Sequence, residues 1–197
     1  YALGHADKSL KKDKEIVMAA VKQDSHWALQ YADDSLKKDR EIVMTAVKLF
    51  GPGLQHADES LKKDKEIVMA AIKQDSYALE HADESLRKDR EFVMATVKEN
   101  WQALGYADDF LLKDREIVMA AIKQDGRALG YADVSLRKDK EIVLAAVKRN
   151  GLALQFADES LKDKEIVMAA IKQDSDALEY VSEELQNDPE IKKLAKG

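Results

Sequence analysis

The stretch SYALEHADESLRKDREFVMATVKEN, residues 76–100, decides the fold because close copies of it fill the 197-residue chain. One leucine marks the same position in each copy, and these leucines are Leu3, Leu29, Leu54, Leu79, Leu104, Leu129, Leu154 and Leu178. The step from one leucine to the next is constant along the chain, except that the first step is one residue longer and the last one residue shorter. A fixed period of about 25 residues is typical of stacked repeat proteins.

Each copy divides into two halves with different patterns. In the first half Leu79, Ala82 and Leu86 recur at three and four residues, which predicts one amphipathic outer helix. The second half, as in residues 67–72, is apolar on every side and charged only at its ends, so we expect an inner helix that is covered on most sides.

An aspartate precedes the second half of every copy and predicts a helix N-cap, because its carboxylate can accept hydrogen bonds from the first free amides. These residues are Asp13, Asp39, Asp64, Asp89, Asp114, Asp139, Asp163 and Asp188. Pro189 follows the last of them at the first helical position, where proline fits.

One continuous helix is the alternative, since a period of about 25 residues is close to seven helical turns. Residues 51–53, Gly-Pro-Gly, would break such a helix, and Gly126 and Gly151 occupy equivalent junctions. A continuous helix would also have its apolar stripe rotated by about 100° at two places. These are the one-residue insertion near His26 and the missing lysine before Asp163. Separate helix-turn-helix repeats therefore explain the sequence better than one continuous helix.

The predicted fold is all-α: a short right-handed α-solenoid of eight helix-turn-helix repeats that form one domain over residues 1–197. Two helices alone are marginal in water, so neighbouring repeats must bury each other's apolar faces. Lys192, Lys193 and Lys196 replace apolar residues in the last copy, which predicts a C-terminal capping repeat over residues 176–197. The first copy shows no such change, and we expect the chain to be a fragment of a longer array.

Composition excludes several classes of protein. The net charge of −6 is spread over mixed acids and bases, so no polybasic field for a polyanion stands out. Without cysteine there is no disulfide framework, thiolate metal site or cysteine nucleophile. No transmembrane stretch or targeting leader is visible, so the sequence does not identify the cellular compartment.

The final copy, ALEYVSEELQNDPEI at residues 177–191, resembles a family of tandem repeats known only as a domain of unknown function. The family's rhythm is Ala-Leu-aromatic-Ala, Ser-Glu-Glu-Leu, Asn-Asp-x-Glu and an apolar run. The resemblance covers essentially the whole chain. It implies a helical fold in tandem copies and supplies no activity, cofactor or catalytic residue.

Two ladders of potential metal ligands have plainer interpretations. Leu144 fills once the position of six methionines, which favours core packing over a soft-metal or partner site: Met18, Met44, Met69, Met94, Met119 and Met168. His5, His56 and His81 replace the tyrosines and phenylalanine of other copies, so we expect flat rings beside the core and no zinc site.

Charged ladders also recur, with a glutamate two residues after each cap and a lysine near the end of most second halves. Both ladders suit the helix dipole, whereas a nucleic-acid site would explain only the lysines. Segments such as ADESLKKDKE lack the central glycine and oxygen ligands of a calcium loop. No unique nucleophile, base and acid stand together, so the sequence predicts neither enzyme nor cofactor.

Recognition is expected where the copies differ. The residue before Ala-Leu varies freely, which predicts exposure: Tyr1, Trp27, Pro52, Tyr77, Gln102, Arg127, Leu152 and Asp176. Trp101 lies beside this position. Phe110, Leu112 and Val134 place apolar side chains where other copies are polar. The candidate partner surface is therefore Trp27, Tyr77, Trp101, Phe110, Leu112, Arg127 and Val134.

The sequence thus favours a non-enzymatic scaffold for a protein partner, or for a second copy of itself. A nucleic-acid or other polyanion-binding array is the first alternative and would depend steeply on salt. An accessory helical domain of a larger enzyme is the second.

Overall fold

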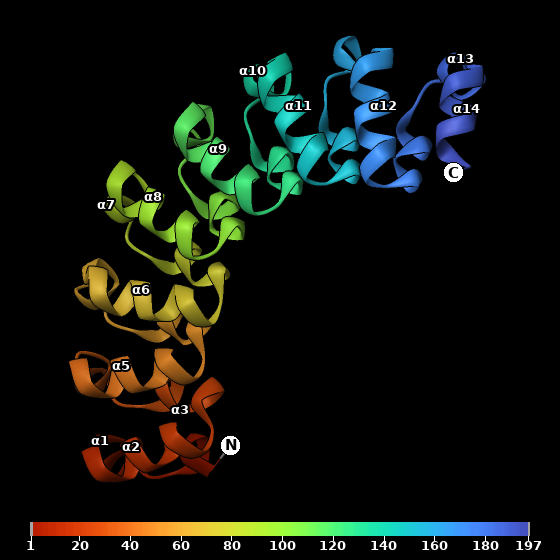
Figure 1. The fold of residues 1–197 in the computed structure, drawn as a ribbon. Coiled ribbons are helices and arrows are strands. Elements are labelled where there is room, and N and C mark those ends of the chain that lie inside the picture. The colour runs from red at the N-terminus through yellow and green to blue at the C-terminus, as the bar shows by residue number, and fades with distance from the viewer. Residues whose placement is uncertain (1, 197) are drawn as a thin grey trace. The chain divides into compact units, whose positions relative to one another are not determined.

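A computed structural model of the chain describes residues 2–196, without the side chains of residues 2, 25 and 26. All its regular elements within these residues are helical, as the sequence predicts, and they repeat in one order along the chain (Figure 1). The described chain divides into two compact units, residues 1–108 and residues 109–197, and each is considered by itself.

The second half of every repeat forms the longest helix of that repeat. These long helices are α2 (Lys14–Gln23), α5 (Arg40–Leu49), α6 (Lys65–Gln74) and α8 (Arg90–Glu99) in the first unit, and α9 (Arg115–Gln124), α11 (Lys140–Arg149), α12 (Lys164–Gln173) and α14 (Pro189–Ala195) in the second. Each begins after its cap aspartate, whose side chain accepts from backbone amides, as from Glu66 (2.9 Å) and Ile67 (3.1 Å) at Asp64. The predicted caps and the position of Pro189 are confirmed.

The first half is two short helices rather than the single predicted one. The opening segments are η1 (Ala2–His5), α3 (Ser25–Tyr31), η2 (Gly51–His56), η4 (Ser76–His81), η5 (Trp101–Tyr106), η7 (Gly126–Tyr131), η8 (Gly151–Phe156) and η10 (Ser175–Tyr180). The middle segments are α1 (Lys8–Lys12), α4 (Asp34–Lys37), η3 (Leu61–Lys63), α7 (Glu84–Arg87), η6 (Leu111–Lys113), α10 (Val134–Arg137), η9 (Glu159–Leu161) and α13 (Glu183–Gln186). The prediction of one outer helix was wrong.

The break between these two segments has a local cause. Ala82 takes an extended conformation with ψ of 155°, and Asp83 then accepts hydrogen bonds from the amide (2.9 Å) and hydroxyl (2.5 Å) of Ser85. Aspartate and serine offer the backbone such local bonds in competition with a continuing helix. In the copies that read Ala-Asp-x-Ser, this pattern therefore starts a new helix instead of prolonging the first.

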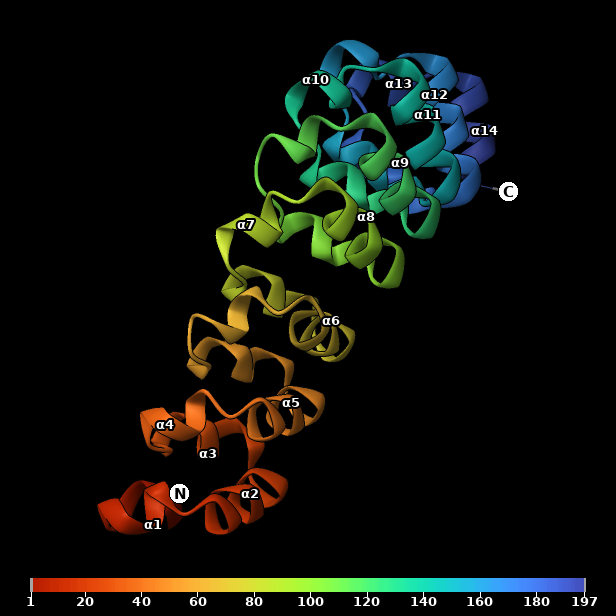
Figure 2. The same cartoon turned by 90° about the vertical axis from the view of Figure 1, so that its left-hand side faces the viewer.

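Within each unit the long helices lie side by side (Figure 1, Figure 2). Five of them, α2, α5, α6, α11 and α12, also pack against their own opening segment and the next one. On α6 the side chains of Ile67, Val68, Ala71 and Ile72 are fully buried between these neighbours. Such burial of about 1.5–3 kcal/mol per large apolar side chain holds the repeats together. No repeat could bury these residues alone.

Polar contacts fix the register between consecutive repeats. The amide of the aspartate that starts each middle segment donates to a carbonyl one repeat earlier, as Asp58 does to Lys37 (3.0 Å) and Asp158 to Arg137 (3.1 Å). A second link joins the first residue of a long helix to the acids of the next one, as Lys14 does with Asp39 (2.8 Å) and Glu41 (2.9 Å). The acids attributed to the helix dipole thus also pair with cations of the preceding repeat.

The ends of the chain present different surfaces. Ile16 is 39% exposed, whereas Ile42, at the same position one repeat later, is fully buried. On α14 and at the residue after it, Lys192, Lys193 and Lys196 are exposed while Ile191 is buried. Among the described residues no helix combines the length and apolarity needed to cross a membrane.

Candidate functional site

The candidate partner residues fall into two groups with different places in the repeat. Trp27, Tyr77, Trp101 and Arg127 lie in opening segments, which follow the C-terminal end of a long helix. Phe110, Leu112 and Val134 lie at or in middle segments, which precede the N-terminal end of the next long helix. A six-residue 3₁₀ helix of about 12 Å separates these two places within a repeat.

The variable position itself is less uniform than expected. Trp27 is 41% and Tyr77 38% exposed, while Gln102, Arg127 and Asp176 are also exposed. Pro52, however, is buried and Leu152 is half-buried, so free variation did not mark solvent exposure in every copy. Tyr1 lies outside the described residues.

The aromatic residues of the first unit pack against other side chains. Tyr77 contacts the rings of His81 and Tyr106 edge-on, with centroid distances of 4.9 and 5.4 Å. Trp27 lines a hollow together with Leu3 and Tyr31. Trp101 is half-buried. These contacts give the aromatic residues a packing role in addition to any role in binding.

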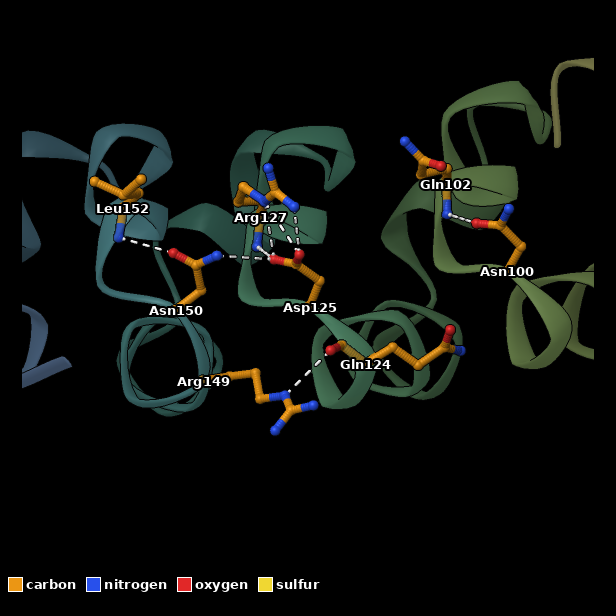
Figure 3. Close-up of polar contacts among 8 residues, drawn as sticks. All are labelled: Asn100, Gln102, Gln124, Asp125, Arg127, Arg149, Asn150 and Leu152. Carbon is orange, nitrogen blue, oxygen red and sulfur yellow. Dashed lines mark hydrogen bonds and ion pairs between the residues drawn. The ribbon is translucent and has the colours of Figure 1, made fainter. Parts of the chain in front are cut away.

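Arg127 is held by the junction at which it lies (Figure 3). Asp125 caps the opening segment by accepting from the Arg127 amide (2.9 Å), and it also binds the guanidinium through Nη2 (2.7 Å). Asn150 repeats the cap one copy later and donates from Nδ2 to Asp125 (3.2 Å). The Arg127 side chain beside Asp125 lowers the pKa of that carboxyl, which keeps the junction charged and paired.

Phe110 and Val134 remain the most exposed apolar residues of the predicted surface, at 51% and 49%. Leu112 is half-buried, and its carbonyl accepts the inter-repeat bond from Asp133 (3.0 Å) directly before Val134. Leu112 and Val134 are therefore neighbours at one joint of the second unit. Trp101 belongs to the first unit and Phe110 to the second.

A second surface, which the sequence analysis missed, runs across the long helices. Hollows of similar lining open between successive long helices, around Met18 and Ala19, around Met44, Met69 and Ala70, and around Leu144, Met168 and Ala169. We call this row of hollows, within each unit, the methionine groove. All six methionines and Leu144 are half-buried.

The methionine groove corrects two expectations. The long helices bury one face and leave the methionine and alanine positions partly open, so they are not covered on most sides. The methionines border the core without belonging to its interior. No signal within one copy distinguishes them, because alanine occupies both the half-buried position of Ala70 and the fully buried position of Ala71.

Charged residues flank the groove at both ends. Glu41, Glu66 and Glu165 lie near the N-terminal ends of their helices, and Lys22, Lys48, Lys148 and Lys172 lie near the C-terminal ends. Each of the three hollows therefore has an apolar floor, with glutamate at one end and lysine at the other. Such a lining suits a peptide or protein surface better than a small substrate, because it is shallow and repeated.

The histidines occupy the position that holds tyrosine or phenylalanine in other copies, as expected. Burial lowers the pKa of His56 and of His81, so both are uncharged rings at neutral pH. The Nε2 atom of His81 is buried without a hydrogen-bond partner. No group of three or more potential metal ligands comes together in residues 2–196.

The comparisons with known proteins agree with the repeat pattern. A family model described as a domain of unknown function (DUF4116) matches residues 1–37, 24–62, 39–87, 64–112, 89–137, 114–162, 139–186 and 163–195. Matches in the middle of the chain begin at positions 39, 64, 89, 114 and 139, and this even spacing confirms the period. Neither a curated protein nor a solved structure matches the chain.

Proposed function

Because the chain belongs to the DUF4116 family of tandem repeats, for which no function is assigned, we propose from its geometry that it is a non-catalytic scaffold for a protein partner. The observation that carries this proposal is the methionine groove, whose lining recurs between successive long helices of both units. A helical array uses its other faces for stacking, so a repeated open face is the surface left for recognition.

The chemistry of the groove supports a protein as the occupant. Methionine is unbranched and polarisable, so a row of methionines adapts to different apolar side chains. The half-exposed Met44 and Met69 lie in one hollow with the stem of Lys48 and the ring of Phe92. These side chains offer contact area and leave no enclosed cavity for a substrate.

Affinity capture from an extract of the source cells tests the proposal with three matched forms of the chain. The first is wild type, the second is Met44→Gln/Met69→Gln in the groove, and the third is Phe110→Asp/Leu112→Lys on the predicted surface. Circular dichroism checks that all three are folded. We expect wild type to retain a protein that the groove variant loses and the third form keeps.

Two other outcomes would change the proposal. Loss of the protein only from the Phe110→Asp/Leu112→Lys form would place recognition on the surface predicted from sequence variation. A wild-type chain that retains no protein would contradict the scaffold proposal.

Polyanion binding is the second candidate, favoured by the exposed lysines at the C-terminal ends of the long helices. Lys22, Lys48, Lys148 and Lys172 recur one per repeat. Retention of nucleic acid that washes off steeply with salt, equally by all three forms, would support this function instead.

A further inference from the structure

The charges around the methionine groove are not balanced. Two of its acids are paired within the fold, since Glu41 binds Lys14 (2.9 Å) and Glu165 binds Lys140 (2.7 Å), whereas Glu15 beside Met18 has no ion pair within residues 2–196. In contrast, Lys22, Lys48 and Lys148 have no ion pair within residues 2–196 and are exposed. These three unpaired lysines outnumber the one unpaired glutamate, so the net unpaired charge along the groove is positive.

This charge lies directly beside the apolar floor. Lys48 and Met44 line the same hollow, as do Lys148 and Leu144. A complementary partner presents apolar side chains to the floor and carboxylates to the lysines. Nucleic acid fits less well, because its phosphate backbone offers nothing apolar to the floor between the lysines.

The groove also favours one partner conformation. Its floor consists of helices whose backbone groups are already bonded internally, so an extended peptide would find no backbone partners there. A helix satisfies its own backbone. Packed helices are about 8–10 Å apart and seven residues of a helix advance about 10.5 Å, so apolar residues at heptad spacing would meet successive hollows.

We infer that the methionine groove binds an amphipathic α-helix with apolar residues about every seven positions and acidic residues beside them. This inference rests on the proposed scaffold function and names the chemistry of its partner. The four long helices of the first unit span three such spacings, which a helix of about 20 residues covers.

A synthetic peptide tests the inference directly. The probe is a labelled helix of about 20 residues, long enough to cross the three spacings of the first unit, with leucine at heptad spacing and flanking glutamates. Fluorescence anisotropy measures its binding to the full chain. A matched peptide carries lysine in place of every glutamate. We expect the acidic peptide to bind at least tenfold more tightly than the basic one.

Two triple variants locate the charge that matters. Lys22→Gln/Lys48→Gln/Lys73→Gln removes three groove lysines, of which Lys73 is 4.0 Å from Glu99. Lys12→Gln/Lys38→Gln/Lys63→Gln removes three other exposed lysines, which lie before the cap aspartates. The groove variant should weaken acidic-peptide binding about tenfold, and the second variant less than twofold.

The apolar floor is tested by measuring acidic-peptide binding to Met44→Gln/Met69→Gln at high salt, where only the apolar contribution remains. We expect this variant to bind the peptide more weakly than wild type does at the same salt concentration. Equal losses in both lysine variants, or no loss in either, would overturn the inference. It would also fail if a single-stranded oligonucleotide bound with the same lysine dependence and no dependence on the methionines. A protein captured from extract without acidic-peptide binding would leave the scaffold function standing while the inference failed.

Discussion

At the scale of single residues, the junction glycines are required by space rather than by backbone conformation. No described glycine has positive φ. A Cβ added to Gly126 would lie 2.1 Å from the carbonyl oxygen of Ala146 in the next long helix. Ser76 occupies the equivalent position in another copy, so the glycine copies approach their neighbours more closely.

Gly126→Ala should therefore destabilise the protein by about 1–3 kcal/mol, as overpacking against a rigid backbone does. The control is Gly53→Ala, where the added Cβ would meet only a Phe50 side-chain carbon at 3.7 Å. This control should be neutral or stabilising, since alanine restricts the unfolded chain. Urea denaturation of both variants measures the difference, and equal losses would contradict the steric explanation.

At the scale of elements, equivalent positions in different long helices have different surroundings. Ile16 and Ile67 both follow the cap aspartate by three residues, yet Ile16 is 39% exposed and Ile67 is fully buried. The identity of the residue alone does not distinguish them.

Ile67→Ala should cost about 2–5 kcal/mol because it leaves a cavity between repeats. Ile16→Ala should cost less than half as much, since water already reaches that side chain. Denaturant unfolding with fluorescence detection compares the two. A similar loss at both positions would mean that Ile16 is covered in solution.

The ion pairs between long helices predict a pH dependence. Hydrogen bonds from lysines lower the pKa of Asp39 and Asp188, and those pairs raise the pKa of Lys14 and Lys164. A lowered carboxyl pKa gives stability that is fully present above the ordinary value of about 3.9 and is lost as the pH falls through the lowered pKa of the folded state. A raised lysine pKa gives stability that is lost above about pH 10.4.

Lys14→Gln/Lys164→Gln should accordingly lower the thermal midpoint at pH 7, and this difference from wild type should shrink as the pH falls below about 3.9 and the acids become protonated. Thermal melts across this range by circular dichroism provide the measurement. Lys12→Gln/Lys138→Gln serves as the control, because these lysines are 4.0 and 3.6 Å from their carboxylates, beyond hydrogen-bond distance. A difference that stays constant down to the lowest pH measured would show that the lysines act through packing.

At the scale of the whole molecule, the repeat period runs without interruption from Leu79 through Leu104 to Leu129. Nothing in the sequence marks a boundary near residue 108. Stability of a repeat array is approximately a sum of repeat and neighbour contributions, and short arrays unfold cooperatively.

We therefore expect one unfolding transition for the full chain, seen at the same temperature by calorimetry and by circular dichroism. Ile67→Ala should shift this transition as a whole. Two separated transitions, with only one of them moved by the substitution, would show that residues 1–108 and 109–197 unfold independently.

The sequence by itself determined the all-α class, the eight copies and the start of every long helix. These features depend on local rules: periodic leucines, an aspartate that bonds nearby amides, and junctions that no continuous helix tolerates. The family match is consistent with the same pattern. Each of these signals lies within a few residues of the element that it specifies.

Only the tertiary structure decided which apolar residues remain open. The sequence presented the second half of each repeat as apolar on all sides, but neighbouring helices cover the isoleucine and valine positions and leave the methionines half-buried. It also decided that Arg127 binds Asp125, and that Glu41 and Glu66 are paired across repeats while Lys22 and Lys48 are not. Exposure and pairing depend on contacts between successive copies, and a pattern within one copy does not contain them.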